Sequence, residues 1–286
     1  LELRGRAQGA NALAQEIAGG SLRPDAFIAI TAEPMQIVLR AGKAAAATPI
    51  AHTSMVLAYA PRGRFAPQFA RAQEPGAPPW WRILQQPGLR FGRTDPRTDP
   101  QGRNIIYVCE LAERLYRQPG LAARILGPTL NPAQIFAETM LEARLQSGEL
   151  DAASAYSVQP GAFGLPVVTL PPEINLGGPL PPLAATGRHP ERQRASLAGN
   201  RSAPTERPTG ATQAKSGEPL GASLELTLEG RVYRPQPLIY YAAALRAAPH
   251  PSAAQRFLRW LQGAEAQALL RRHGYDAPGA APPLTA

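Results

Sequence analysis

One short segment, residues 93–103, constrains the fold of this chain more than any other. It reads Arg-Thr-Asp-Pro-Arg-Thr-Asp-Pro-Gln-Gly-Arg and follows the apolar run at 89–91. This order predicts a strand, a tight turn and then a helix capped by Asp99, with Pro100 as its first residue. The first N–H groups of such a helix have no partner within it, and the helix dipole favours negative charge there. The segment therefore predicts an anion-binding site.

The residues before this turn alternate between strand and helix patterns. Apolar runs predict strands at 25–30 and 54–59, and apolar periodicity predicts a helix that ends at Gly19 and a short helix at 35–39. A βαβα order of this kind is typical of a parallel sheet covered by helices.

A second unit begins after a connection rich in Pro, Gly and Arg at 61–80. Its predicted elements are a helix at 81–85, a strand at 89–91, helices at 102–117 and 132–147, and strands at 151–158 and 167–170. In the helix at 132–147, the residues expected to face inward are Ile135, Phe136, Met140 and Leu141.

Residues 177–220 break this pattern because they contain almost no large apolar side chains. Such a segment cannot offset its ordering entropy, so we predict a disordered insert. Order is expected to return with a hairpin at 223–233, whose turn is Glu229-Gly230. A strand at 238–241 and a final helix at 252–272 complete the predicted elements.

Composition narrows the class of protein. Hydrophobic residues make up 44% of the 286 residues, which is enough for real cores. The net charge of +9 comes from scattered basic residues without a basic stripe or interleaved aromatics, so we expect no nucleic-acid partner. Cys109 is the one cysteine, which excludes an internal disulfide, and its apolar neighbours predict burial.

Two features of the sequence bear on the compartment of the protein: its apolar runs and its N-terminus. No apolar run approaches the roughly 20 residues that a membrane helix needs. The chain opens at Leu1 rather than Met, in what reads as the end of a strand, so we expect sequence to precede it. The missing signal peptide therefore says nothing about compartment.

Several blocks of this sequence, in order, resemble the molybdate/tungstate-binding proteins of ABC importers. No single block is very specific, and the resemblance rests on their shared order over nearly the whole chain apart from the insert. The blocks are 9–17 with 24–27, 52–59, the Asp-Pro turn at 93–103, 148–156 with 170–176, and the stretch from 233 to 275, which looks like the family's closing hinge and helix.

The resemblance implies an α/β, two-lobed type II periplasmic-binding fold, in which each lobe is a mostly parallel sheet covered by helices and crossing strands form the hinge. Lobe one would combine 1–58 with 242–286, and lobe two would be 59–241. The implied function is the solute-binding component of an ABC importer, which captures a tetrahedral oxyanion, molybdate or tungstate first, between the lobes.

The same resemblance implies the partners and the location of the protein. The partners would be the oxyanion and the membrane permease of the importer. The protein would be a monomer without enzymatic activity or a cofactor, in the periplasm or anchored at the cell surface.

The ligand-binding residues that the resemblance implies lie in both lobes: Gly9, Ala10, Asn11, Ser54, Asp99, Gln101, Gly102 and Tyr156. Gln101 and Gly102 would donate backbone N–H groups. Tyr156 either donates its hydroxyl or packs in the sheet, and Ser54 either faces the cleft or starts a strand. Asp99 is first a helix cap, because its charge repels an oxyanion unless the carboxyl is protonated or coordinates the metal centre of the oxyanion.

Three departures set this chain apart from the family. The family's first strand and its Gly-Ser-Leu donor loop would lie before Leu1, and Ala10 stands where a Ser usually opens the helix. Ala155 stands where some tungstate binders have a Glu, which argues against six-fold coordination by two protein carboxylates. The missing donors predict weak binding.

Two other functional classes stay open at this point. One is a degenerate relative that no longer binds a ligand. The other is a hydrolase or transferase on a similar α/β scaffold, for which the sequence supplies no nucleophile–base pair and no motif such as HExxH, GxSxG or a P-loop.

Overall fold

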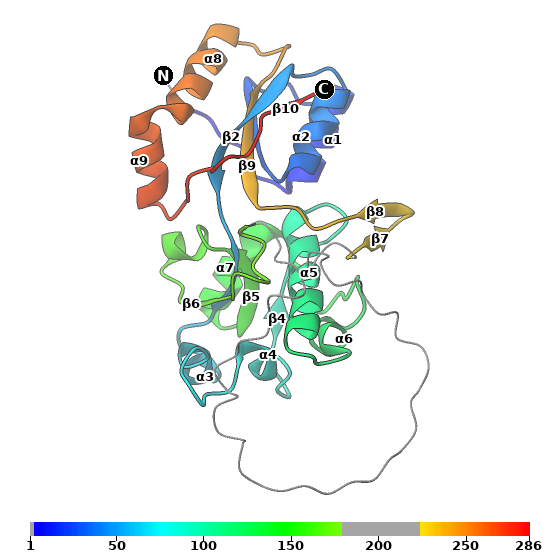
Figure 1. The fold of residues 1–286 in the computed structure, drawn as a ribbon, viewed down its shortest axis with the longest axis vertical. Coiled ribbons are helices and arrows are strands. Elements are labelled where there is room, and N and C mark those ends of the chain that lie inside the picture. The colour runs from blue at the N-terminus through cyan, green and yellow to red at the C-terminus, as the bar shows by residue number, and fades with distance from the viewer. Residues whose placement is uncertain (1–2, 179–223) are drawn as a thin grey trace, which may run out of the picture.

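A computed structural model describes residues 3–178 and 224–286 of the chain (Figure 1). The insert predicted at 177–220 lies, from residue 179 onward, outside these described residues. In chain order the elements are α1 (Ala10–Gly19), β1 (Ala26–Ile30), α2 (Ala32–Arg40), β2 (Ala46–His52), β3 (Met55–Tyr59), α3 (Ala66–Ala70), α4 (Trp80–Ile83), β4 (Phe91–Gly92), α5 (Pro100–Leu115), α6 (Leu121–Leu126), α7 (Glu138–Ser147), β5 (Ala152–Tyr156), a 3₁₀ turn (Pro160–Phe163), β6 (Val167–Thr169), β7 (Leu226–Leu228), β8 (Arg231–Tyr233), β9 (Ile239–Ala244), α8 (Pro251–Gln262), α9 (Ala264–Arg272) and β10 (Leu284–Thr285).

The first half of the molecule, as named here, combines α1, β1, α2 and β2 with β9, α8, α9 and β10, so both ends of the chain contribute to it. It is built on a four-stranded sheet in the order β1-β9-β2-β10, with helices on both faces (Figure 1). Successive side chains of a strand point to opposite faces. Accordingly, Tyr241 and Ala243 of β9 pack with α1 and α2, whereas Ala242 packs with Leu261 of α8. Burial of both faces of the sheet explains why these strands are almost continuously apolar.

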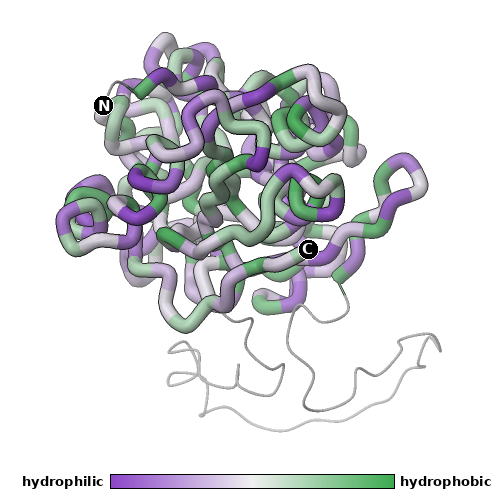
Figure 2. The backbone as a smooth tube through the Cα atoms, turned by 90° about the horizontal axis from the view of Figure 1, so that it is seen from above, coloured by the Kyte–Doolittle hydropathy of each residue, from purple (hydrophilic) through white to green (hydrophobic). Residues whose placement is uncertain are grey.

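The second half is a sheet in the order β4-β5-β3-β6. Leu57 of β3 faces a large cluster that includes residues of α3, α4, α5 and α6. Its neighbours Val56 and Ala58 face the other side, where Leu141 and Leu145 of α7 cover them. Seen from above, apolar stretches run through the middle of the molecule and hydrophilic ones are frequent on the outer turns (Figure 2).

Two segments cross between the sheets. One is the step from β2 to β3, and the other leads from β8 into β9 (Figure 1). They are bonded to each other, because the Thr53 N–H donates to the Leu238 carbonyl at 3.0 Å. The Leu238 N–H in turn donates to the Leu176 carbonyl at 3.1 Å, so three distant parts of the chain meet at this crossing.

Within these two sheets the expectation of mostly parallel strands is wrong for neighbouring strands. Only β4 and β5 pair in parallel among the described neighbours, while β9 pairs antiparallel with both β1 and β2. The βαβα pattern is confirmed in one respect: β1 and β2 run in the same direction, since both run antiparallel to β9. The physical reason for the error is that β9, from the far end of the chain, inserts between them.

The helices predicted at 132–147 and 252–272 also need correction. Residues 132–134 form a turn and Ile135 forms a parallel bridge with Arg93, where the Phe136 N–H donates to the Arg93 carbonyl at 2.9 Å, so α7 begins only at Glu138. Met140 is 43% exposed instead of facing inward. The last predicted helix is two helices, because Gly263 has extended backbone angles and separates α8 from α9.

The strands and hairpin near 54–59, 151–158, 167–170 and 223–233 are confirmed within a few residues as β3, β5, β6 and the β7–β8 pair. By sheet pairing, β3 from Met55 belongs to the second sheet and β9 from Ile239 to the first. Cys109 is buried, as expected. Among the described residues, no helix combines the length and apolar character needed to span a bilayer.

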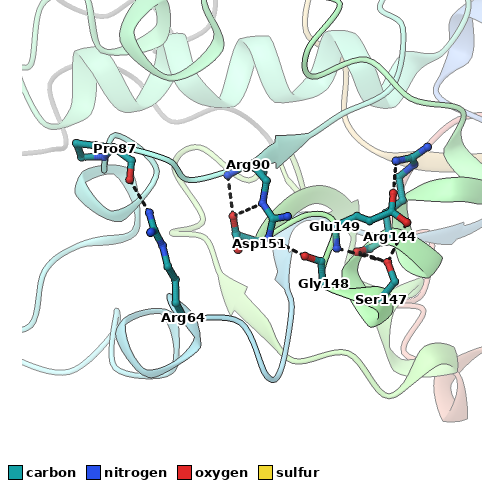
Figure 3. A network of polar contacts seen from close by, with 8 residues as sticks. All are labelled: Arg64, Pro87, Arg90, Arg144, Ser147, Gly148, Glu149 and Asp151. Atoms are coloured by element: carbon teal, nitrogen blue, oxygen red, sulfur yellow. Dashed lines mark hydrogen bonds and ion pairs between the residues drawn. The ribbon is translucent and has the colours of Figure 1, made fainter.

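A buried carboxylate fixes the parallel pair of the second sheet. Asp151 precedes β5 and accepts hydrogen bonds from the backbone N–H and the guanidinium of Arg90, at 2.8 to 3.0 Å (Figure 3). Arg90 also donates to the Gly148 carbonyl at 2.6 Å. Burial alone would raise the pKa of Asp151, but the bonds from Arg90 outweigh burial and lower it.

We therefore predict that Asp151→Ala lowers the free energy of unfolding by about 2 kcal/mol or more, because it leaves the Arg90 N–H without its acceptor. Glu74→Gln is the matched control, since the Arg71–Glu74 pair is exposed and such pairs contribute little. Chemical denaturation measures both variants. An Asp151→Ala variant as stable as Glu74→Gln would contradict the prediction.

Candidate functional site

The Asp-Pro turn folds as the sequence predicted. The Asp99 carboxylate caps α5 by accepting from the Gln101 N–H at 2.9 Å, and Pro100 is the first helical residue. Asp95 holds the turn before it, because its carboxylate accepts from the backbone N–H of Arg97 at 2.9 Å. A Cβ atom at Gly102 would lie 2.4 Å from the Thr94 carbonyl oxygen, so only glycine lets the turn close over the helix.

The start of α1 lies against the start of α5. A Cβ atom at Gly9, the N-cap of α1, would lie 2.8 Å from the Thr98 carbonyl oxygen. Gln101 is buried, and so is Asn11 in the first turn of α1. Two helix N-termini from different halves of the molecule therefore meet, which places Gly9, Ala10 and Asn11 beside the turn at 93–103.

Tyr156 lies at the end of β5 and is buried next to this junction. Its hydroxyl accepts a hydrogen bond from Asn104 Nδ2 at 3.1 Å, which leaves its own proton free to be donated. The side-chain oxygen of Gln159 accepts from the Tyr156 N–H at 2.8 Å and from Gln101 Nε2 at 3.0 Å. Gln159 Nε2 then donates to Glu138 at 2.8 Å, so one network joins α5, α7 and β5.

Ser54 lies on the crossing segment, half-buried, immediately before β3. Its carbonyl accepts from the Ser157 N–H at 2.9 Å, which holds it beside Tyr156. Its neighbour Thr53 is fully buried and shares a hydrogen bond of 2.9 Å with the Ser157 hydroxyl. The predicted site residues of both halves thus come together around the crossing and the two helix starts.

Opposing effects act on the pKa of the buried acid at this junction. Burial raises the pKa of Asp99 to about 7, and the charge of Glu138 adds to the effect, while the Gln101 N–H and Arg103 oppose it. Burial and the Asp99 charge also raise the pKa of Tyr156, so its hydroxyl keeps its proton. At neutral pH the site can therefore present neutral donors.

Several residues at the junction were missed by sequence reasoning: Glu33, Arg103, Asn104, Glu138, Gln159 and Tyr240. Most carried no local signal, because only the folded chain brings them to Tyr156. Arg103 did carry one: a cation in the first turn of a helix opposes the helix dipole and calls for an anionic partner. That partner is Glu33 of α2, whose carboxylate lies 2.7 Å from the guanidinium.

The described residues offer no metal-binding cluster of three or more His, Cys, Asp or Glu side chains. Cys109 is not an activated nucleophile either, because burial raises the pKa of its thiol to about 12. Among the described residues, the junction therefore offers hydrogen-bonding groups rather than a metal site or an activated thiol.

Similarity to known proteins extends over most of the chain. Residues 1–276 match the protein family described as bacterial extracellular solute-binding protein. The molybdate/tungstate-binding protein WtpA of Thermococcus kodakarensis is 24% identical over 247 residues, which cover 79% of this chain and 58% of that protein. A solute-binding protein of Petrotoga mobilis is 32% identical over 127 residues, 44% of this chain and 37% of the relative. The chain thus spans less than two thirds of these relatives' length.

Solved structures share the fold. The periplasmic molybdate-binding protein of Azotobacter vinelandii superposes with a TM-score of 0.56 at 13% identity, over 94% of this chain and 85% of that one. The sulfate-binding protein SubI of Mycobacterium tuberculosis gives 0.52 at 11% identity, over 95% and 75%. At these identities the likeness establishes the two-lobed type II periplasmic-binding fold and leaves the ligand open.

We predict that Asp99→Asn reduces the dependence of stability on pH. The folded-state pKa of Asp99 is raised, so its contribution to stability is complete below the ordinary value of 3.8 and is lost as the pH rises to about 7. Without this titration, the unfolding free energy of Asp99→Asn should fall less steeply with pH between those limits. The slopes of the two proteins should differ by up to about 1.4 kcal/mol per pH unit. Glu138, whose charge acts on Asp99, also responds to the substitution, so the difference reports on these two acids together, whereas more distant buried acids cancel in the comparison.

Denaturation of both proteins at about pH 5 and about pH 7.5 measures this effect. Asn is a good N-cap residue, so the helix start itself should persist. Parallel pH profiles for the two proteins would show that Asp99 titrates normally.

Proposed function

Because the chain belongs to the bacterial extracellular solute-binding proteins, we propose that it captures a tetrahedral oxyanion between its two halves for an ABC importer. The preferred ligand is molybdate or tungstate, on the strength of the relatives that carry this name. The membrane permease of the importer would receive the ligand. The family description supports an extracellular or periplasmic location.

One observation carries the proposal: the N-termini of α1 and α5 meet from opposite halves. The N-terminal amides of a helix attract anions through unpaired N–H groups and the helix dipole. Two such ends that meet can together hold a dianion without any counter-cation. Closure of the halves would bring both sets of donors to the ligand at once.

The proposed donors follow from which groups are already engaged. The Gln101 N–H is taken by Asp99, so the Gly102 N–H is the first one free at the start of α5. The backbone of Gly9, Ala10 and Asn11 would supply donors from α1, and the Tyr156 hydroxyl would add another. Ser54 would complete the set from the crossing segment, while Asp99 would contribute as a protonated donor or as a ligand to the oxyanion's metal centre.

Two buried side-chain atoms at these helix starts support a bound group. Asn11 Oδ1 and Gln101 Oε1 have no hydrogen-bond partner within the described residues. Buried polar atoms are nearly always paired, and an amide side chain can present either its oxygen or its NH₂ group. An oxyanion dianion accepts hydrogen bonds and does not donate them, so it would meet a flipped amide NH₂ group, whereas a bound water would donate to the oxygens as they stand.

The proposal predicts selective binding of one oxyanion. Calorimetry with molybdate, tungstate, sulfate and phosphate should show binding of molybdate or tungstate, with weak affinity because Ala10 lacks the hydroxyl of a serine. Thermal stability should rise only with the same ion, since a ligand that binds the folded state stabilises it. If none of the four ions gives a heat of binding or raises the melting temperature, the chain is better explained as a degenerate relative that no longer binds a ligand.

Tyr156→Phe tests the proposed donor directly. Loss of one hydrogen bond to a charged group, about 1.5–3 kcal/mol, should weaken binding by about tenfold to a hundredfold. Tyr59→Phe is the control, because Tyr59 is also a buried tyrosine of the second half but stacks on Phe69 instead. Equal affinities for the two variants would remove Tyr156 from the site.

A further inference from the structure

A carboxylate of the chain bridges the two halves beside the proposed ligand site. Glu33 lies in the first turn of α2, in the first half. Its Oε2 atom lies 2.7 Å from the guanidinium of Arg103 in α5, in the second half. Its Oε1 atom accepts from Asn11 Nδ2, at the start of α1, at 3.3 Å. One anionic group thus holds a donor from each half.

Arg103 is held rigidly in a buried position. Its other guanidinium nitrogen donates to the Pro96 carbonyl at 2.8 Å, and the group stacks on the Tyr233 ring at 4.4 Å. Among the described residues, Glu33 forms an ion pair with Arg103 at 2.7 Å and supplies a full opposite charge. A buried guanidinium is stabilised by an anion and strongly disfavoured without one, so Arg103 favours whichever conformation brings an anion to it.

The position of the pair links it to the ligand site. Asn11 is one of the proposed ligand donors, and Arg103 follows Gly102 directly. The positive charge of Arg103 acts on the neighbouring acids and hydroxyls, Asp99 and Tyr107, whose pKa values it lowers against the effect of burial. Glu33 therefore holds side chains that adjoin the proposed ligand donors in both halves.

We propose that Glu33 is an internal anion, which holds Arg103 and Asn11 and keeps the two halves together until an oxyanion takes over that role. The pair Glu33–Arg103 then sets the equilibrium between open and closed forms. This inference rests on the proposed function only for the exchange with the oxyanion. The part played by Glu33 in closing the halves stands without it.

The test is the distance between the halves, measured by pulsed electron paramagnetic resonance. Spin labels at Gln15→Cys in α1 and Ala143→Cys in α7 report on it, because both positions are exposed while the native Cys109 is buried. Without added ion, Glu33→Gln and, separately, Arg103→Gln should give a longer and broader distance distribution than the parent. Saturating molybdate should return Glu33→Gln to the parent distance.

Glu16→Gln is the control, because the Arg6–Glu16 pair lies within the first half and its loss should leave the distance unchanged. Melting temperatures confirm that each variant is folded. Parent-like distances for Glu33→Gln without ion would overturn the inference, whatever the protein binds. If molybdate binds Glu33→Gln in calorimetry but the distance stays long, the oxyanion does not take over the role of Glu33, and that part of the inference is overturned. If the parent does not bind molybdate, only the proposed function is overturned.

Discussion

The backbone hydrogen bond between the two crossing segments constrains how the two sheets are placed relative to each other. Thr53 and Leu238 are more than 180 residues apart in the chain, yet their main chains bond where β2 and β9 leave the first sheet. Because β3 continues directly from one crossing segment, this bond and the bond from Leu238 to Leu176 help to place the second sheet. The start of α5 consequently faces the start of α1, and a site built by both helices becomes possible.

The junction between the halves carries both signs of charge, which constrains how an anion is held there. Asp99 and Glu138 would repel an oxyanion if both were ionised, but burial raises the pKa values of both groups. The cation Arg103 is already neutralised by Glu33. The groups proposed to meet an anion are neutral N–H and O–H donors, which act strongly on a charged acceptor in a site with little water.

The parts of this arrangement that were predictable are the ones fixed by neighbours in sequence. A capping Asp, a proline at the first helical position and a close-packed glycine define the start of α5 from residues 93–103 alone, and the resemblance to a family supplied the fold. The insertion of β9 between β1 and β2 was not predictable from alternation of elements, because that pairing joins the two ends of the chain. Glu138 and Gln159 were missed for the same reason, since only tertiary contacts bring them to Tyr156.

The two glycines at the helix starts show what kind of recognition this site can perform. Neither Gly9 nor Gly102 has a positive φ angle among the described residues, so neither is needed for an unusual backbone conformation. Each is needed because a Cβ atom would collide with a carbonyl oxygen of the Asp-Pro turn. Main chain therefore packs directly on main chain, which fixes the proposed backbone donors in place. Recognition built in this way would depend mainly on the size and charge of the anion, and the proposed Glu33–Arg103 pair would adjust how readily the halves close.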